Sequence, residues 1–248
     1  MKKIINESLN KIDSKKTVIL IHGYLTNYLD FNHLPKYLSK YYDYVVIVDL
    51  PGHGKYRNIK EFKVDATIKK VEQELEYYLK KGTVDLIGFS MGGALSRYLC
   101  VKYKEVRNAV LLAPATYYLS PLFTLERAKY IIGNKKDENE LKNLKENDKT
   151  SYDIIKELTL KKFNLDNGLT FCKLIYKINL IKGFNPTRTL IMRGTLDELV
   201  PKYSADYCYK NCINPGKELV YVKGLGHLML RSNKEQLIID KIMEFLTK

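Results

Sequence analysis

Cysteine is scarce in this sequence, and its spacing does not indicate a disulfide framework or a zinc site. Of the four cysteines among 248 residues, Cys208 and Cys212 share a face if their segment is helical, but no second pair of ligands accompanies them. We therefore expect these two, with Cys100 and Cys172, to be small buried residues in a reduced setting. No metal site is expected.

Long apolar runs are also lacking. The basic N-terminus, residues 1–7, is followed by polar residues and not by the apolar core of a signal peptide, and no segment reads as a membrane span. A cytoplasmic location is the expectation. Internal repeats, Pro-rich or Gly/Ser-rich linkers and phosphate-binding glycine loops are absent, because residues 52–54 lack the third glycine and the helix start of a dinucleotide site. We expect no cofactor.

Acidic residues are outnumbered, with 28 Asp and Glu against 42 Lys and Arg and a formal net charge of +14. A charge of this size favours anionic partners. The basic residues are dispersed as lysine pairs, however, and no nucleic-acid motif accompanies them, so no nucleic-acid partner is expected. Weak contact with an anionic membrane surface stays open, as does the oligomeric state.

Apolar runs of strand length alternate with longer amphipathic stretches. In residues 66–79, for example, apolar side chains recur at helical spacing, and a last helix is expected over about residues 234–246. This alternation predicts one α/β domain with a largely parallel sheet covered by helices on both faces. Strands are expected near residues 17–21, 45–49, 84–87, 109–113, 189–193 and 218–222.

One pentapeptide indicates a nucleophile. Residues 88–92 read Gly-Phe-Ser-Met-Gly, with a strand-like run before them and a helix-compatible stretch after them. A sharp reversal between strand and helix exposes the hydroxyl of Ser90, and glycine is needed on both sides because a flanking side chain would collide with neighbouring elements. For the pentapeptide alone, a small residue in a tight turn is the alternative.

A serine hydroxyl needs a histidine to take its proton and a carboxylate to orient that histidine. The candidate carboxylate is Asp197 and the candidate base is His227, and each follows an apolar run where a strand gives way to a loop. Asp197 can alternatively be a turn former or a helix cap. Glu198 is its adjacent competitor, and a surface or core imidazole is the alternative for His227.

The chain order Ser, Asp, His, together with residues 18–24 and 45–54 as strands that end in glycine-containing loops, resembles the α/β-hydrolase superfamily. The similarity is to its small carboxylesterases and monoacylglycerol lipases. It implies a trimmed version of the usual eight-stranded sheet, a mostly parallel sheet flanked by helices, with residues 1–115 and 187–248 as the core. Residues 116–186 are then a helical cap inserted after the sixth family strand.

The cap is expected because some seventy residues separate two of the predicted strands, far more than one crossover helix requires. Residues 151–158 and 169–181 both have apolar side chains three and four apart. A cap excludes water and shapes the substrate pocket. Its expected lining is apolar and aromatic and includes Tyr117, Tyr118, Leu119, Leu122 and Phe123, which points to an acyl chain or an aromatic acid as the buried half of the substrate. The alternative is that these residues only dock the cap on the core.

The resemblance further implies an oxyanion hole formed by the amides of Tyr24 and Met91, with Leu25 as the alternative to Tyr24. One such donor is typically worth about 3–4 kcal/mol. His22 and His53 lie in loops that are structural in the family, so their ring nitrogens are expected to bond backbone carbonyls. His33 is expected to face solvent or to pack.

We therefore expect a serine carboxylester hydrolase, an esterase or lipase that forms an acyl-enzyme on acyl-chain or small aromatic acyl esters, monoacylglycerol-like ones among them. A thioesterase or a carbon–carbon bond hydrolase with the same triad stays open. The lyase branch of the menaquinone pathway commonly has Arg where this chain has Ala94, which disfavours a dianionic substrate. A non-catalytic ligand receptor on the same scaffold is the remaining alternative.

Overall fold

A six-stranded parallel sheet forms the centre of the fold in the computed structural model, which describes residues 14–54, 58–117, 165–197 and 199–248. The strands lie in the spatial order β2-β1-β3-β4-β5-β6. Each lies within a few residues of its expected position, which confirms the strand predictions. Their bounds are β1 Lys15–Ile21, β2 Tyr44–Val48, β3 Gly82–Phe89, β4 Val106–Leu112, β5 Arg188–Gly194 and β6 Glu218–Val222.

Helices connect these strands, and α2 and α9 confirm the two helices expected over residues 66–79 and 234–246. The helices are α1 Leu34–Leu38, α2 Val64–Leu79, α3 Met91–Lys102, α7 Leu165–Asn179, α8 Lys202–Asn211 and α9 Glu235–Thr247. Short 3-10 turns are η1 Tyr28–Phe31, η2 Ile59–Glu61 and η3 Met229–Arg231.

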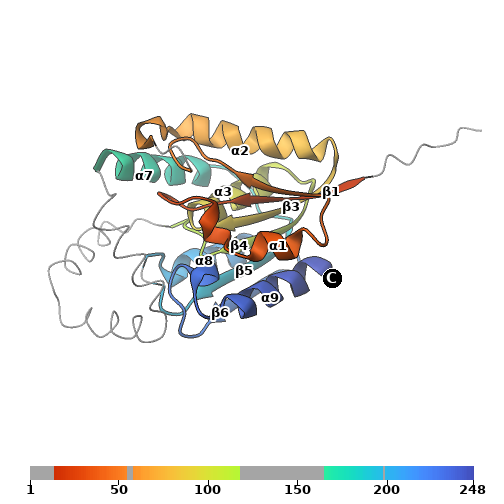
Figure 1. The fold of residues 1–248 in the computed structure, drawn as a ribbon. Coiled ribbons are helices and arrows are strands. Elements are labelled where there is room, and N and C mark those ends of the chain that lie inside the picture. The colour runs from red at the N-terminus through yellow and green to blue at the C-terminus, as the bar shows by residue number, and fades with distance from the viewer. Residues whose placement is uncertain (1–13, 55–57, 118–164, 198) are drawn as a thin grey trace, which may run out of the picture.

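Both faces of the sheet are covered by helices. Helices α2, α3, α7 and α8 contribute to the core on one face, and α1 and α9 to the core on the other; Figure 1 shows α2 and α7 above the sheet and α9 below it. Along β1, Ile19 and Ile21 enter the first core, whereas Val18 and Leu20 enter the second. Burial on both faces explains the uninterrupted apolar runs, and the predicted fold class is confirmed.

The carboxyl ends of all six strands lie at one edge of the sheet because the strands are parallel. The order in which strands are added to the sheet reverses at β1, because β2 lies on one side of β1 and β3 on the other. In open α/β sheets, ligands bind outside the carboxyl ends at such a switch point. The loops after β1, β3, β5 and β6 therefore surround the expected site.

The expected insertion falls in the connection between β4 and β5, of which the structure describes residues 113–117 and 165–187. Its last part, α7, confirms the helix expected near residues 169–181, and packs against α2 and α3. Buried side chains of α7, such as Phe171 and Leu174, join the core on that face of the sheet. Residues 118–164, including the helix expected over 151–158, lie outside the described residues, so a cap over Ser90 stays a prediction.

The four cysteines are free; Cys100, Cys208 and Cys212 are buried, and Cys172 is half-buried. Burial raises the pKa of the Cys208 thiol to about 11, partly offset by its hydrogen bond with Thr116, so this thiol stays protonated. Within the described parts of the chain, no helix combines the length and apolar character that crossing a bilayer takes.

Candidate active site

Ser90 lies at the turn from β3 to α3 in a strained backbone conformation, with φ 55° and ψ −114°. Its amide donates to the carbonyl of Leu112 at 2.8 Å, and its carbonyl accepts from the amide of Ala115 at 3.0 Å. The end of β4 therefore holds Ser90 on both sides. Such over-determination lets a non-glycine residue keep a positive φ.

The flanking glycines allow this turn to sit against the sheet. A Cβ on Gly92 would lie 1.8 Å from the carbonyl oxygen of Ile21, at the end of β1. A Cβ on Gly88 would lie 2.2 Å from the carbonyl oxygen of Gly92 and 2.4 Å from Oγ of Ser96. A side chain at either position would therefore collide with neighbouring elements, as expected from the sequence, and these elements are α3 and the end of β1.

Asp197 and His227 meet at the same edge of the sheet. Nδ1 of His227 lies 2.9 Å from Oδ2 of Asp197, and the two side chains are 5% and 0% exposed. Oδ1 of Asp197 accepts from the amides of Leu199 and Val200 at 3.0 Å and 2.9 Å. With Nδ1 directed at the carboxylate, Nε2 is the ring nitrogen left for proton transfer.

The surroundings of Asp197 keep it ionised. Burial acts to raise the pKa of its carboxyl group, but the charge and hydrogen bond of His227, with the guanidinium of Arg193, outweigh burial and hold the pKa below its ordinary value. Asp197 therefore carries a negative charge near neutral pH. Glu198, the adjacent competitor, lies outside the described residues.

His227 also lies beside the residue that precedes Ser90. The rings of His227 and Phe89 have centroids 4.9 Å apart. Ser90 follows β3, Asp197 follows β5 and His227 follows β6, so the three predicted residues follow strand ends at one edge of the sheet, with β4 lying between β3 and β5. The structure joins Asp197 to His227 directly, and it places His227 beside the turn that carries Ser90.

Arg193, at the end of β5, was not singled out from the sequence. Its buried guanidinium donates to the carbonyls of Gly194 at 2.8 Å, Asp197 at 2.9 Å and Val200 at 2.9 and 3.1 Å. It therefore holds together the turn that carries the Asp197 carboxylate. A charged side chain at the end of an apolar strand was the signal that could have found it.

The loop after β1 carries the first predicted oxyanion donor. Within it, Leu25 has a φ of 60°, and the amide of Gly23 donates to Oδ2 of Asp30 at 2.9 Å. The ring of Tyr24 stacks on Phe171 of α7, with centroids 4.8 Å apart. The second predicted donor, the amide of Met91, begins α3, where no intrahelical acceptor is available to it.

Asp30 is a second residue that the sequence analysis missed. It is buried, accepts from the Gly23 amide and the Thr26 hydroxyl through Oδ2, and finds no hydrogen-bond partner for Oδ1 among the described residues. Burial raises its pKa to about 6, although Thr26, Gly23, Arg231 and His227 each act to lower it. Asp30 thus fixes the loop of the predicted oxyanion hole while holding its proton more tightly than an exposed Asp.

The other histidines have the structural roles expected of them. Nδ1 of His22 donates to the carbonyl of Gly23 at 2.9 Å, and Nδ1 of His53 donates to the carbonyl of Pro51 at 2.9 Å. The exposed His33 ring contacts Glu235, with Nδ1 2.9 Å from Oε2. Among the described residues, no three His, Cys, Asp or Glu side chains come together as a metal site requires.

Comparison with known families and proteins places this site in context. Residues 16–150, more than half of the chain, match the model of a family described as alpha/beta hydrolase fold. An AB hydrolase superfamily protein of Gibberella zeae is 20% identical over 109 residues, and a pimeloyl-[acyl-carrier protein] methyl ester esterase of Neisseria meningitidis is 31% identical over 102 residues. These alignments cover 44% and 41% of the chain, and span only 39% and 37% of the relatives' own length.

Two longer similarities extend over nearly the whole chain. The thermostable monoacylglycerol lipase of Bacillus sp. (strain H-257) is 22% identical over 237 residues, which cover 93% of this chain and 90% of the lipase. The structure of a monoacylglycerol lipase from Paleococcus ferrophilus superposes with a TM-score of 0.67 at 17% identity, over 93% of each chain. At such identity the structural likeness shows the shared fold.

Proposed function

This chain belongs to the α/β-hydrolase fold family, and we propose that within it the chain is a serine hydrolase that cleaves carboxylic esters through an acyl-enzyme. The observation that carries the proposal is the placement of the buried Asp197–His227 pair beside the strained turn of Ser90. An exposed or unpaired histidine at this edge would leave the serine without a base. The resemblance to esterases and lipases supports the same reaction class.

In the proposed reaction, Oγ of Ser90 attacks the ester carbonyl while Nε2 of His227 takes the serine proton. The carboxylate of Asp197, already hydrogen-bonded to Nδ1, stabilises the imidazolium that forms. His227 then gives the proton to the departing alkoxide, which leaves as the alcohol. A water molecule repeats these steps on the acyl-enzyme, so that the acid is released and Ser90 regains its proton.

Negative charge develops on the former carbonyl oxygen in both halves of this reaction. We assign its stabilisation to the amides of Tyr24 and Met91. The Met91 amide suits this role because it lies next to Ser90 at the positive end of the α3 dipole. For Tyr24, support comes from the loop itself, which Asp30 fastens at Gly23 and Thr26. Loss of one such donor typically costs about 3–4 kcal/mol of transition-state stabilisation.

The substrate in this proposal is an ester with an acyl chain or a small aromatic acyl group, monoacylglycerol-like esters included. The alignment with a monoacylglycerol lipase over most of both chains supports this class. The half-buried ring of Tyr24, which stacks on the core residue Phe171 where α7 approaches the loop after β1, suits an apolar acyl group. In the same proposal, residues 116–186 form the cap that encloses that group.

The test compares alanine substitutions at two serines, Ser90 in the turn before α3 and Ser96 within α3. Ser90→Ala should abolish hydrolysis of short p-nitrophenyl esters, whereas Ser96→Ala should retain it, because Oγ of Ser96 is buried and has no hydrogen-bond partner within the described part of the chain. Thermal unfolding of both variants reports that they are folded. Retained turnover in Ser90→Ala would remove this mechanism. Acyl esters of graded chain length, with thioesters alongside, then define the substrate.

A further inference from the structure

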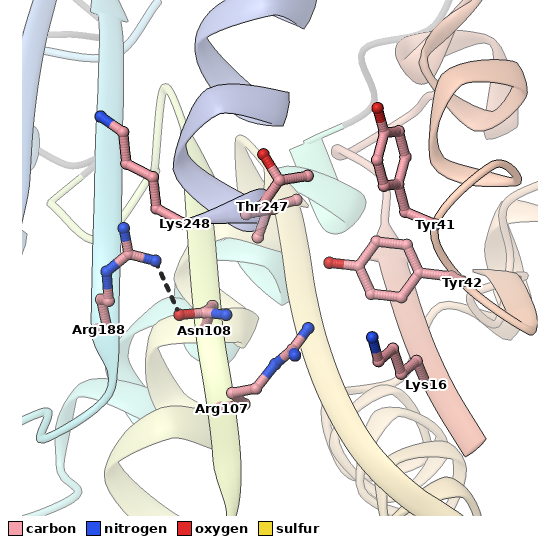
Figure 2. A pocket seen from close by; sticks show the side chains of 9 residues that line it. Lys16, Tyr41, Tyr42, Arg107, Asn108, Arg188, Thr247 and Lys248 are labelled. Carbon is pink, nitrogen blue, oxygen red and sulfur yellow. Dashed lines mark hydrogen bonds between the residues drawn. The ribbon is translucent and has the colours of Figure 1, made fainter. Parts of the chain in front are cut away.

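A concave site lies at the edge of the sheet opposite to Ser90, at the amino ends of the strands. It has a volume of about 540 Å³, within the usual range for small-molecule sites. Figure 2 shows Arg188 and Lys248 on one side of this cleft and Lys16 and Tyr42 on the other, with Arg107 between them. No residue of the proposed active site takes part in it.

The lining of the cleft is strongly biased in charge. Four of its nine residues are cationic and none is acidic, although Lys and Arg make up only 42 of the 248 residues of the chain. The cations come from segments far apart in the sequence: β1, β4, β5 and the segment after α9. A dispersed positive charge alone would not bring them together around one cavity.

The buried carboxylate of Asp85 holds Arg107 in place. Its guanidinium donates to both carboxylate oxygens of the fully buried Asp85, with Nε 2.9 Å from Oδ1. The hydroxyl of Tyr42 and the amide of Asn108 donate to the same carboxylate. Arg107 is thus held at the cleft by a two-point contact with Asp85, and its side chain is 38% exposed. Asp85 offsets its charge but fixes its orientation.

Arg188 is fixed in a different way and has no carboxylate partner in the described part of the chain. Its Nη1 donates to the Phe245 carbonyl at 2.8 Å and to Oδ1 of Asn108 at 3.2 Å. Its guanidinium carbon lies 3.9 Å from the centre of the Phe245 ring. A planar guanidinium held in one orientation is pre-organised for two-point bonding to phosphate oxygens.

The rim adds two ammonium groups and an aromatic face. Lys248 pairs with Glu244 in an exposed contact of the kind that contributes little, so its ammonium group remains available. Lys16 faces it across the cleft (Figure 2). The ring of Tyr41 is 54% exposed at the edge of the cavity. Such a ring can stack on a flat heterocycle.

We propose that this cleft binds a phosphorylated small molecule of nucleotide size, with its phosphate groups between Arg107, Arg188 and the two rim lysines. The two anchored guanidinium groups favour phosphate oxygens, and the cavity is much larger than one phosphate requires. The site is independent of the ester chemistry proposed above. It assigns a ligand to a part of the fold that the serine does not reach.

The experiment measures binding of ADP and of pyrophosphate by calorimetry in a phosphate-free buffer. The wild-type protein should bind ADP saturably at one site and should not bind adenosine. Lys16→Gln/Lys248→Gln should weaken ADP binding roughly tenfold, the loss of two charge-assisted contacts. Arg188→Gln is the second test variant. Thermal unfolding without ligand reports that each variant is folded.

Lys69→Gln/Lys210→Gln is the matched control, because it removes the same charge from exposed positions on α2 and α8. It should change ADP affinity less than about twofold. If both double variants weakened ADP binding equally, the overall positive charge of the protein and not the cleft would attract ADP, and the proposal would be overturned. The absence of saturable binding up to roughly 5 mM ADP would also overturn it. Binding to phosphatidylglycerol vesicles without binding of ADP or pyrophosphate would overturn it in favour of a lipid surface.

Discussion

Oδ2 of Asp197 lies 2.9 Å from Nδ1 of His227, although thirty residues separate them in the chain. The second oxygen of the same carboxylate accepts two backbone amides, and both side chains are buried. The histidine is therefore held in one orientation, with its proton on Nδ1. This relationship sets the tautomer of the imidazole and the direction of its other ring nitrogen, on which the proposed proton transfer depends.

Asp197→Asn should lower kcat for p-nitrophenyl esters by roughly 10³- to 10⁴-fold, because the amide removes the charge that stabilises the imidazolium and permits the wrong tautomer. Steady-state kinetics at pH 7 measure the effect. The exposed Asp240→Asn on α9 is the matched control and should leave kcat unchanged. A fall of less than about tenfold in a folded Asp197→Asn protein would contradict the assigned role.

Gly92→Ala should destabilise the fold by about 3 kcal/mol or more, since the new Cβ would lie 1.8 Å from the carbonyl oxygen of Ile21. The roughly 1 kcal/mol that alanine gains over glycine within a helix is too small to offset this. Gly216→Ala, whose nearest contact would be 3.2 Å, should cost less than about 1 kcal/mol. Urea unfolding compares the two, and similar losses would show that α3 can shift away from β1.

Arg193→Lys should lower kcat at least about tenfold while leaving KM nearly unchanged. Lysine keeps the charge but cannot reach the three carbonyls that the guanidinium joins, so the Asp197 turn loosens without any loss of substrate contact. The split between kcat and KM is the diagnostic readout. Loss of stability with an unchanged kcat would make Arg193 a purely structural residue.

Asp30 should make stability depend on pH. Its pKa is about 6 in the fold against 3.8 in an unstructured chain, so between about pH 4 and pH 6 the folded protein holds a proton that the unfolded chain has released. This group therefore lowers the free energy of unfolding as pH rises, by roughly 3 kcal/mol over the complete titration.

Asp30→Asn removes this titration but keeps an oxygen acceptor for Gly23 and Thr26. From pH 4 to pH 7, the unfolding free energy of the variant should therefore rise relative to that of the wild type by roughly 2 kcal/mol. Urea unfolding of both proteins at the two pH values measures it. A difference that stays constant would show that Asp30 titrates as it does in an unstructured chain.

Features of the fold that are determined by residues close together in the sequence could be predicted. The strands could be placed because burial on both faces of a parallel sheet leaves continuous apolar runs, as in β1. The turn at Ser90 could be placed because glycine is required at residues 88 and 92. Asp197 and His227 could be chosen because each follows a strand in the chain order that the resemblance implies.

The rest depends on contacts that periodicity does not encode. Arg193 donates a hydrogen bond to the carbonyl of Val200, which comes within reach only when the turn after β5 has folded. Asp30 acts through the Gly23 amide on the preceding loop. The helical pattern of α7 predicted the helix but not its packing against α2 and α3. The cleft of Figure 2 joins residues from both ends of the sequence, so no single segment carries its signature.

Reaction with a fluorophosphonate probe tests the central claim most directly, because the probe reacts with an activated serine whatever the natural substrate is. Mass spectrometry of the labelled, digested protein should find one adduct, on Ser90, and Asp197→Asn should slow its formation strongly. Absence of an adduct on Ser90 in folded protein, or an equal rate of labelling in Asp197→Asn, would contradict a nucleophile activated by the Asp197–His227 pair.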